Sequence, residues 1–226
     1  MLFQSLPFLF VFLPVALLGY HLARTDGMAK GWLILASLAF YGYWDRRLLP
    51  LLIVAACVTW IAARLALRRR QPRWLIAGTA GNLLLLGFFK YTNFLLENLV
   101  VVTGTPFPRF NIVLPLAISF FTFHQVSYLI DVWRKQAGYY RFDDYLLYIA
   151  FFPHLIAGPI VRHYEFMPQI GSARRSCTAE LAARGLGLFA LGLAKKIWIA
   201  DPLSTVADGI FAHWLRNSPK PTSKLL

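Results

Sequence analysis

Long apolar runs, separated by short basic or turn-forming stretches, are the feature that most restricts the fold of this chain. The first run, Leu6–Leu22, has 17 residues and no charged side chain beyond His21. A bilayer core needs about 20 apolar residues per spanning helix, so each run and its flanks suffice for one crossing. Further runs follow at Gly31–Trp44, Leu48–Ala63, Trp74–Phe89, Asn111–Trp133 (the longest), Tyr145–Val161 and Gly185–Ala200. The pattern predicts an all-α integral membrane protein, a polytopic helical bundle. Tyr91–Val102 is more typical of an interfacial helix.

Composition supports this class and excludes others. Of the 226 residues, 58% are hydrophobic and 15% are charged, whereas a soluble domain has roughly 25% charged residues. An ordinary soluble enzyme, a disordered tail and a disulfide-stapled module are therefore excluded. Cys57 and Cys177 lie in an apolar run and a basic stretch, and neither has metal-ligand spacing to a second Cys or a His. Neither a disulfide nor a metal site is predicted.

The distribution of the basic residues predicts an orientation in the membrane. The net charge is +13, and the Lys and Arg residues lie at the ends of the apolar runs, where they meet anionic headgroups. No pattern typical of nucleic-acid binding accompanies them. Arg64–Arg73 has five arginines and no acid, which predicts a cytoplasmic loop and a periplasmic N-terminus. Alternation then places Arg24–Lys30 and Arg134–Asp144 in the cytoplasm and Tyr91–Phe110 outside.

The run Tyr145–Val161 breaks this alternation. If it crossed the membrane fully, the four arginines of Arg162–Arg184 would lie outside. Pro153 and the pair Gly158-Pro159 interrupt the run, and a broken helix is tolerated at membrane depth where protein buries it. We therefore predict a re-entrant segment that returns Arg162 to the cytoplasmic side. A spanning helix with a proline kink is the alternative.

Polar residues inside the apolar runs are the candidates for chemistry, because a polar group at membrane depth is costly. His124, Tyr128 and Asp131 are spaced i, i+4 and i+7, one stripe of a helix, with Gln125 and Ser127 beside it. The stripe would form an intramembrane polar site or a hydrogen-bonded contact between helices.

Four further residues complete the candidates. His154 lies at the expected helix break and would act as a base or cap freed carbonyls. Arg162, Lys195 and Lys196 would contact the phosphates of an acyl donor or lipid headgroups. Up to this point, a transporter, a channel and a membrane enzyme all fit the sequence.

Five longer segments carry a resemblance. They are ASLAFYGYWDRRLLPLLI (36–53), FFKYTNFLLEN (88–98), LPLAISFFTFHQVSYLIDVWR (114–134), DYLLYIAFFPHLIAGPIVRHYEFMPQI (144–170) and GLFALGLAKKIWIADPL (187–203). In this order they resemble the bacterial alginate O-acetyltransferase branch of the membrane-bound O-acyltransferases, the MBOAT family. The similarity runs to about Ala212.

The resemblance implies a multi-pass enzyme of the bacterial inner membrane. It would transfer an acyl group from a cytoplasmic donor, a coenzyme A thioester, to an exported polysaccharide such as alginate, together with periplasmic acetylation proteins. No bound cofactor is expected. A histidine takes the hydroxyl proton in such a transfer while neighbouring donors stabilise the oxyanion.

The resemblance also assigns this chain to part of the family's length. Residues 1–212 correspond to the N-terminal half, and 213–226 form a polar tail that suggests a truncation or frameshift. The family's catalytic histidine, in a Trp-His context, is expected beyond Leu226, so no residue of this chain is assigned as the base and the chain alone is expected to be inactive. A transporter, or a non-catalytic scaffold that pairs with a separate C-terminal half, is the alternative.

Overall fold

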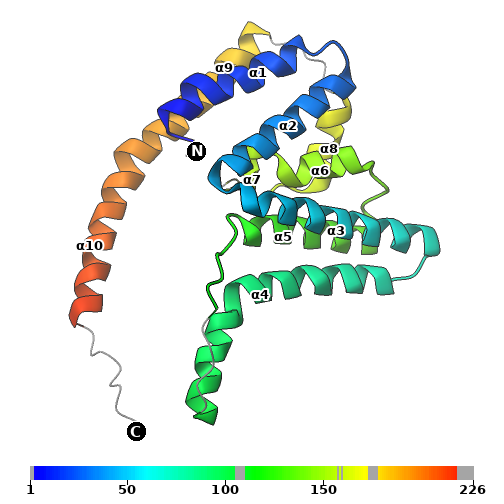
Figure 1. Cartoon of the computed structure of the whole chain (residues 1–226). Coiled ribbons are helices and arrows are strands. Elements are labelled where there is room, and N and C mark those ends of the chain that lie inside the picture. The colour runs from blue at the N-terminus through cyan, green and yellow to red at the C-terminus, as the bar shows by residue number, and fades with distance from the viewer. Residues whose placement is uncertain (1–2, 105–109, 157, 159, 173–177, 218–226) are drawn as a thin grey trace. The chain divides into compact units, whose positions relative to one another are not determined.

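The computed structural model describes residues 3–104, 110–156, 158, 160–172 and 178–217, and every regular element in these ranges is helical (Figure 1). This confirms the all-α prediction. The chain divides into two compact units, Met1–Ala173 and Arg174–Leu226, here called the first and second unit. Pro159, Arg174, Arg175, Cys177 and residues 218–226 of the predicted tail lie outside the described residues.

The first unit begins with a π-helical turn, Phe8–Phe12, that continues directly into α1. A short 3-10 turn, Arg46–Leu48, precedes α3. The helices of this unit are α1 (Leu13–Leu22), α2 (Asp26–Trp44), α3 (Leu49–Arg69), α4 (Arg73–Thr103), α5 (Ile118–Trp133), α6 (Phe142–Ala150), α7 (Phe152–Leu155) and α8 (His163–Ser172). Two of the helices are long and apolar enough to cross a membrane, at Arg46–Arg69 and Arg73–Thr103, while Phe8–Leu22 forms a shorter apolar helix.

Two of the expected segment boundaries are wrong. Trp74–Phe89 and the expected interfacial helix Tyr91–Val102 form one continuous helix, α4, of 31 residues. Phe88–Asn93, which joins them, contains neither proline nor glycine, so no local signal ends the helix there. The polar side chains of this stretch lie on the surface of α4 and do not interrupt it.

The longest expected run, Asn111–Trp133, also differs. Helix α5 has only 16 residues, about 24 Å, because it begins at Ile118. Ala117, just before it, has a left-handed backbone with φ 60°. The Tyr41 hydroxyl donates a hydrogen bond to the carbonyl of Leu116 at 3.0 Å and anchors this non-helical entry.

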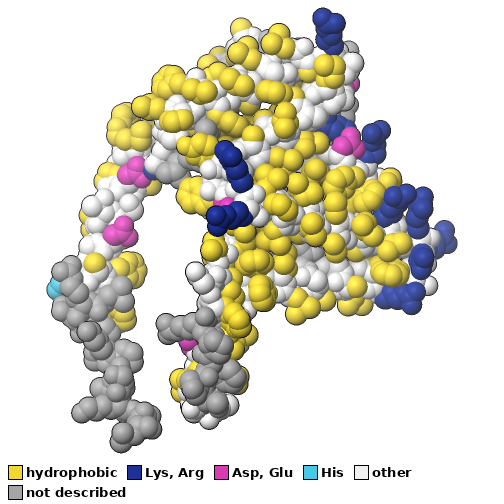
Figure 2. All heavy atoms as spheres, viewed as in Figure 1, with side chains coloured by type: hydrophobic (Ala, Val, Ile, Leu, Met, Phe, Trp, Pro, Cys, Tyr) yellow, Lys and Arg dark blue, Asp and Glu magenta, His cyan; other side chains and the backbone are white. Residues whose placement is uncertain are grey.

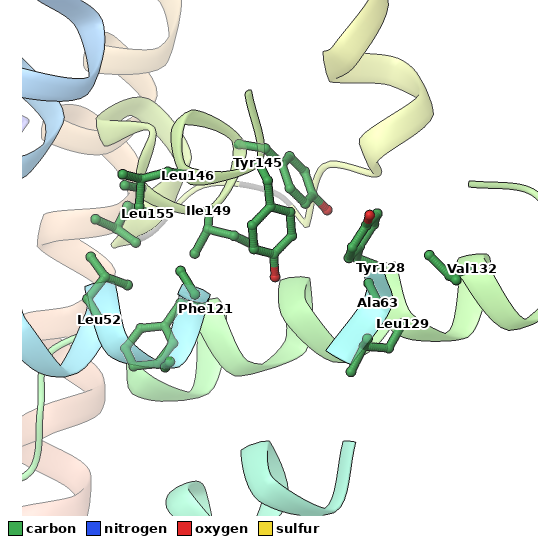
Figure 3. Close-up of a cluster of buried hydrophobic side chains, with 14 of the residues drawn as sticks. Leu52, Ala63, Phe121, Tyr128, Leu129, Val132, Tyr145, Leu146, Ile149 and Leu155 are labelled. Carbon is green, nitrogen blue, oxygen red and sulfur yellow. The ribbon is translucent and has the colours of Figure 1, made fainter. Parts of the chain in front are cut away.

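The core of the first unit lies where α3, α4, α5 and α6 pack together. Leu52 of α3, Phe121 and Leu129 of α5 and Ile149 of α6 are buried in one cluster (Figure 3). Gly78 allows α4 to approach closely, since a Cβ at that position would lie 2.9 Å from Ala62 Cβ and 3.0 Å from Leu129 Cδ1. Small residues serve this role in membrane helix packing, where close van der Waals contact stabilises the bundle.

The predicted helix break is confirmed. Helix α6 ends at Ala150, Phe151 leaves the helical conformation with ψ 113°, and α7 is a single short turn. The Phe152 backbone N–H donates to Ser37 Oγ at 3.2 Å, so protein groups satisfy this freed donor. Residues 145–150 are all buried, as a broken helix at membrane depth requires. Whether the segment re-enters the membrane stays a prediction.

An ion-pair cluster joins the beginnings of α2 and α6. Lys30 Nζ contacts Asp144 and lies 3.3 Å from Asp143 Oδ2, and Arg141 Nε lies 3.1 Å from Asp143 Oδ1. Partial burial acts to raise the pKa of Asp143, but hydrogen bonds from Arg141 and Lys30 outweigh it and lower that pKa. Burial conversely opposes the charged form of Lys30, and the two carboxylates raise its pKa.

The arginine-rich segment forms the tip of the α3–α4 hairpin. Arg64, Arg68 and Arg69 lie in the last turns of α3, and the chain reverses at Arg70, whose φ is 52°. Figure 2 shows Lys and Arg side chains gathered over this tip, beside a broad apolar surface. The arrangement is typical of a helix pair whose basic end lies at the headgroup level.

We expect the tip to be cytoplasmic. In a chain with Cys57→Ala and Cys177→Ala, an Arg70→Cys variant should react with an impermeant maleimide only after the cells are permeabilised. Thr103→Cys, at the other end of α4, is the matched control and should react in intact cells. Reaction of Arg70→Cys in intact cells would contradict the orientation.

The described part of the second unit, residues 178–217, forms a continuous helical segment. It comprises α9 (Ala179–Lys195), a π-helical turn (Lys196–Ala200) and α10 (Asp201–Asn217). Thr178 caps its start, because Thr178 Oγ1 accepts a hydrogen bond from the Leu181 backbone N–H at 3.2 Å. The apolar run Gly185–Ala200 lies within this segment, and most of its large apolar side chains are exposed: Leu186, Leu188, Phe189, Leu191, Ile197, Trp198 and Ile199.

Candidate functional site

The predicted polar stripe of α5 is present and buried. His124, Tyr128 and Asp131 lie on the inner face of the helix, together with Gln125, and each is at most 1% exposed. Their spacing places them on one face, as expected. They nevertheless contact three different sets of partners, so the stripe does not form one site. Ser127 lies beside it, half-buried.

Asp131 is the centre of a charged cluster in which Asp131 and His163 are buried and Arg162 is 48% exposed. His163 Nδ1 lies 3.1 Å from Asp131 Oδ2, and Arg162 Nη1 lies 3.9 Å from Asp131 Oδ1. His163 is 1% exposed, and the rings of Tyr128 and Tyr140 pack against it with centroids 5.9 and 5.8 Å away. A carboxylate removed from water is costly unless such partners face it, so the cluster constrains all three groups.

The turn after α5 fixes the backbone at Asp131. The backbone N–H groups of Gln136 and Ala137 both donate to the Asp131 carbonyl, at 2.8 and 3.1 Å. The Tyr128 hydroxyl donates to the Gly138 carbonyl at 3.4 Å. Since Nδ1 of His163 faces Asp131, a neutral His163 with its proton on Nδ1 keeps Nε2 as an acceptor. The His163 ring is enclosed by protein, so it has no access to a ligand in this structure. Its role here is to position Asp131.

His124 and His154 meet in a second cluster. Their ring centroids lie 5.1 Å apart, and Tyr148 packs on His124 at 5.6 Å. His154 Nε2 lies 2.8 Å from the Tyr148 carbonyl oxygen, which is the contact that a capping role at the helix break requires. The Tyr148 hydroxyl donates to the Val161 carbonyl at 2.9 Å, which connects α6 with the non-helical segment before α8.

Gln125 belongs to a third set that links three helices. Thr59 Oγ1 donates to Gln125 Oε1 at 2.5 Å, and Asn82 Nδ2 donates to Thr59 Oγ1 at 2.8 Å and to the Gly78 carbonyl at 2.9 Å. These contacts join α3, α4 and α5 in the way that polar side chains stabilise membrane bundles.

The contacts of His163, Thr59 and Asn82 were not predicted from the sequence. Thr59 and Asn82 are single polar residues within apolar runs, and a polar residue at membrane depth is itself a signal of a role. The sequence does not show, however, which face of each helix meets its neighbour, so it does not identify their partners. His163 follows the helix break, far in sequence from Asp131, and no spacing rule connects them.

The predicted lysines lie in the second unit. Lys196 Nζ contacts both oxygens of Asp201, at 2.6 and 2.8 Å, so part of its charge is neutralised locally. Lys195 is the residue before it, at the end of α9. Among the described residues, no group of three or more His, Cys, Asp or Glu side chains could hold a metal ion.

An open depression of about 400 Å³ lies over the outer side of α5. Asp131 and Arg162 belong to both the depression and the charged cluster. The lining residues are Phe123, Val126, Ser127, Ile130, Asp131, Arg134, Ile160 and Arg162. The surface is therefore apolar along most of its length and charged at one end.

Comparison with known proteins connects this chain with a family of membrane enzymes. Residues 116–222 match the profile described as MBOAT, membrane-bound O-acyltransferase family. The chain is 38% identical to the peptidoglycan O-acetyltransferase of Helicobacter pylori, over 92% of this chain and 46% of that protein. It is also 38% identical to the probable alginate O-acetylase AlgI of Pseudomonas aeruginosa, over 94% of this chain and 42% of that protein. For AlgI of Azotobacter vinelandii the identity is 37%, over 94% and 44%.

The chain thus spans less than half the length of these curated relatives. No solved structure is significantly similar to it.

Proposed function

Since the chain belongs to the membrane-bound O-acyltransferase family, we propose that it forms part of an enzyme that transfers an acetyl group to a hydroxyl of a cell-envelope glycan. One observation carries the proposal: more than nine-tenths of the chain is similar both to a peptidoglycan O-acetyltransferase and to alginate O-acetylases. Peptidoglycan and alginate are different polymers, but both offer a sugar hydroxyl as the acceptor group. We further propose that the protein lies in the bacterial inner membrane with its N-terminus in the periplasm.

The chemistry is acyl transfer. The donor is a thioester, such as acetyl-coenzyme A, that is supplied from the cytoplasmic side. The acceptor oxygen attacks its carbonyl carbon, so that a C–O bond forms and the C–S bond breaks. The hydroxyl proton passes to a general base, and the leaving thiolate takes up a proton. Hydrogen-bond donors around the carbonyl stabilise the oxyanion that develops. Periplasmic acetylation proteins would carry the acetyl group or the acceptor.

We assign the buried groups of α5 a positioning role in this enzyme. His124, Gln125 and Tyr128 contact neighbouring helices at hydrogen-bond or ring-stacking distance, and all are enclosed by the bundle. Such contacts fix the positions of the helices around the reacting groups, and acyl transfer requires that these groups be positioned precisely. Lys195 and Lys196 would attract the phosphates of the donor, as a cationic entrance does.

Co-expressed with the C-terminal half of a related family member, the chain should add O-acetyl groups to one glycan in cells that lack their own glycan O-acetyltransferases, whereas the chain alone should add none. Radiolabelled acetate incorporation, followed by separation of peptidoglycan from exported uronate polymer, identifies the acceptor. His124→Gln should retain activity within about tenfold, because a positioning residue touches no reacting atom, and the exposed His21→Gln is the matched control. Loss by 10²- to 10⁴-fold in His124→Gln alone would instead mark His124 as the general base. A folded, membrane-inserted chain that gives no incorporation into either glycan even with the C-terminal half supplied would contradict the proposed function.

A further inference from the structure

The outer face of α5 carries a groove that the proposed acyl transfer does not use. Phe123, Ser127, Ile130 and Arg134 follow one another at i, i+4, i+7 and i+11, so they form a single stripe, roughly 100° around the helix from the buried one. Phe123 is 50% and Ile130 38% exposed, although both are large apolar side chains. The stripe faces out of the bundle that the described residues form.

The polar end of the groove is cationic and preorganised. Arg134 lies at the C-terminal end of α5, and Arg162 approaches from the segment before α8. Arg162 is held by two contacts: its Nη1 is 3.9 Å from Asp131 Oδ1, and its guanidinium lies 6.0 Å from the centre of the Tyr164 ring. Asp131 itself is turned towards His163. Two guanidinium groups, of Arg134 and Arg162, therefore line an end of the groove that holds one carboxylate, which leaves this end attractive to an anion.

The length of the groove matches one leaflet. From Arg134 to Phe123 the helix rises about 16 Å, and half of a typical hydrocarbon core is about 15 Å. Between them the walls are apolar, formed by Val126, Ile130 and Ile160. A ligand that fills the groove thus has an anionic head and one extended hydrocarbon chain.

We propose that this groove binds an anionic phospholipid, with its phosphate between Arg134 and Arg162 and an acyl chain along α5 to Phe123. The site would hold a structural lipid on the outside of the bundle, and it does not depend on the proposed acetyl transfer. The acyl donor also carries phosphates, but an open apolar wall of leaflet length suits a lipid chain and offers no complement to a nucleotide.

Native mass spectrometry of the protein released from nanodiscs tests the proposal. With equal phosphatidylglycerol and phosphatidylcholine, the wild type should retain phosphatidylglycerol. Each basic residue near an anionic headgroup contributes about 5-fold in affinity, so the double variant Arg134→Gln/Arg162→Gln should lose about 30-fold. The matched control is Arg68→Gln/Arg69→Gln, which removes two charges from the α3–α4 tip and should retain the lipid.

A second variant tests the apolar wall without changing charge. Ser127→Trp fills the middle of the groove and should displace the lipid while the thermal unfolding midpoint stays within a few degrees. Equal phosphatidylglycerol retention by the wild type and the Arg134/Arg162 variant would overturn the proposal. Displacement of the bound lipid by acetyl-coenzyme A at stoichiometric concentration would overturn it too, and would assign the two arginines to the donor.

Discussion

Replacement of Asp131 by alanine is expected to destabilise the first unit by about 3–5 kcal/mol, the largest effect among single polar substitutions in this chain. The carboxylate is nearly inaccessible and faces His163 at 3.1 Å and Arg162 at 3.9 Å. Removing it leaves the buried imidazole and the guanidinium without the acceptor that they face. Unfolding in detergent, followed by circular dichroism during titration with sodium dodecyl sulfate, measures the change.

The control is Asp143→Ala at the edge of the bundle. Its carboxylate contacts Lys30 and Arg141 but is 36% exposed, and a surface ion pair contributes only about 0–1 kcal/mol. A third variant, Asp131→Leu/His163→Phe, removes both buried partners and should recover part of the loss, because only Arg162, which is 48% exposed and reaches water, is left without its partner. Equal destabilisation by Asp131→Ala and Asp143→Ala would show that the charged cluster of Asp131 is not a structural centre.

Phe121→Ala should give the second large effect, about 2–3 kcal/mol. Phe121 is fully buried where α5 packs against its neighbours. In a bilayer, transfer from water contributes little to helix association, so the cost comes from the lost packing. A cavity costs about 24 cal/mol per Å³, and a phenyl ring leaves roughly 100 Å³.

Phe123→Ala is the matched control, since Phe123 lies on the same helix two residues later and is 50% exposed. Its substitution should change stability by less than about 0.5 kcal/mol. The same titration measures both variants. If Phe123→Ala were as destabilising as Phe121→Ala, the assignment of inner and outer faces to α5 would be wrong.

Several features followed from the sequence alone because they depend on local spacing. The long apolar runs predicted helices and a membrane protein. The i, i+4, i+7 spacing of His124, Tyr128 and Asp131 predicted a shared face, and all three are on the buried side of α5. Pro153 predicted the break after Ala150, because proline lacks the N–H that a continuing helix would use.

Other features were decided only by tertiary packing. His163 meets Asp131, and Thr59 and Asn82 meet Gln125, through helices whose relative rotation no local pattern specifies. The start of α5 depends on a hydrogen bond from Tyr41, a residue of α2. Helical periodicity determines which residues share a face, but which faces meet depends on how whole helices pack. In lipid, that choice depends on close packing and on the need of buried polar groups for partners, since apolar surface alone gains little by leaving the bilayer.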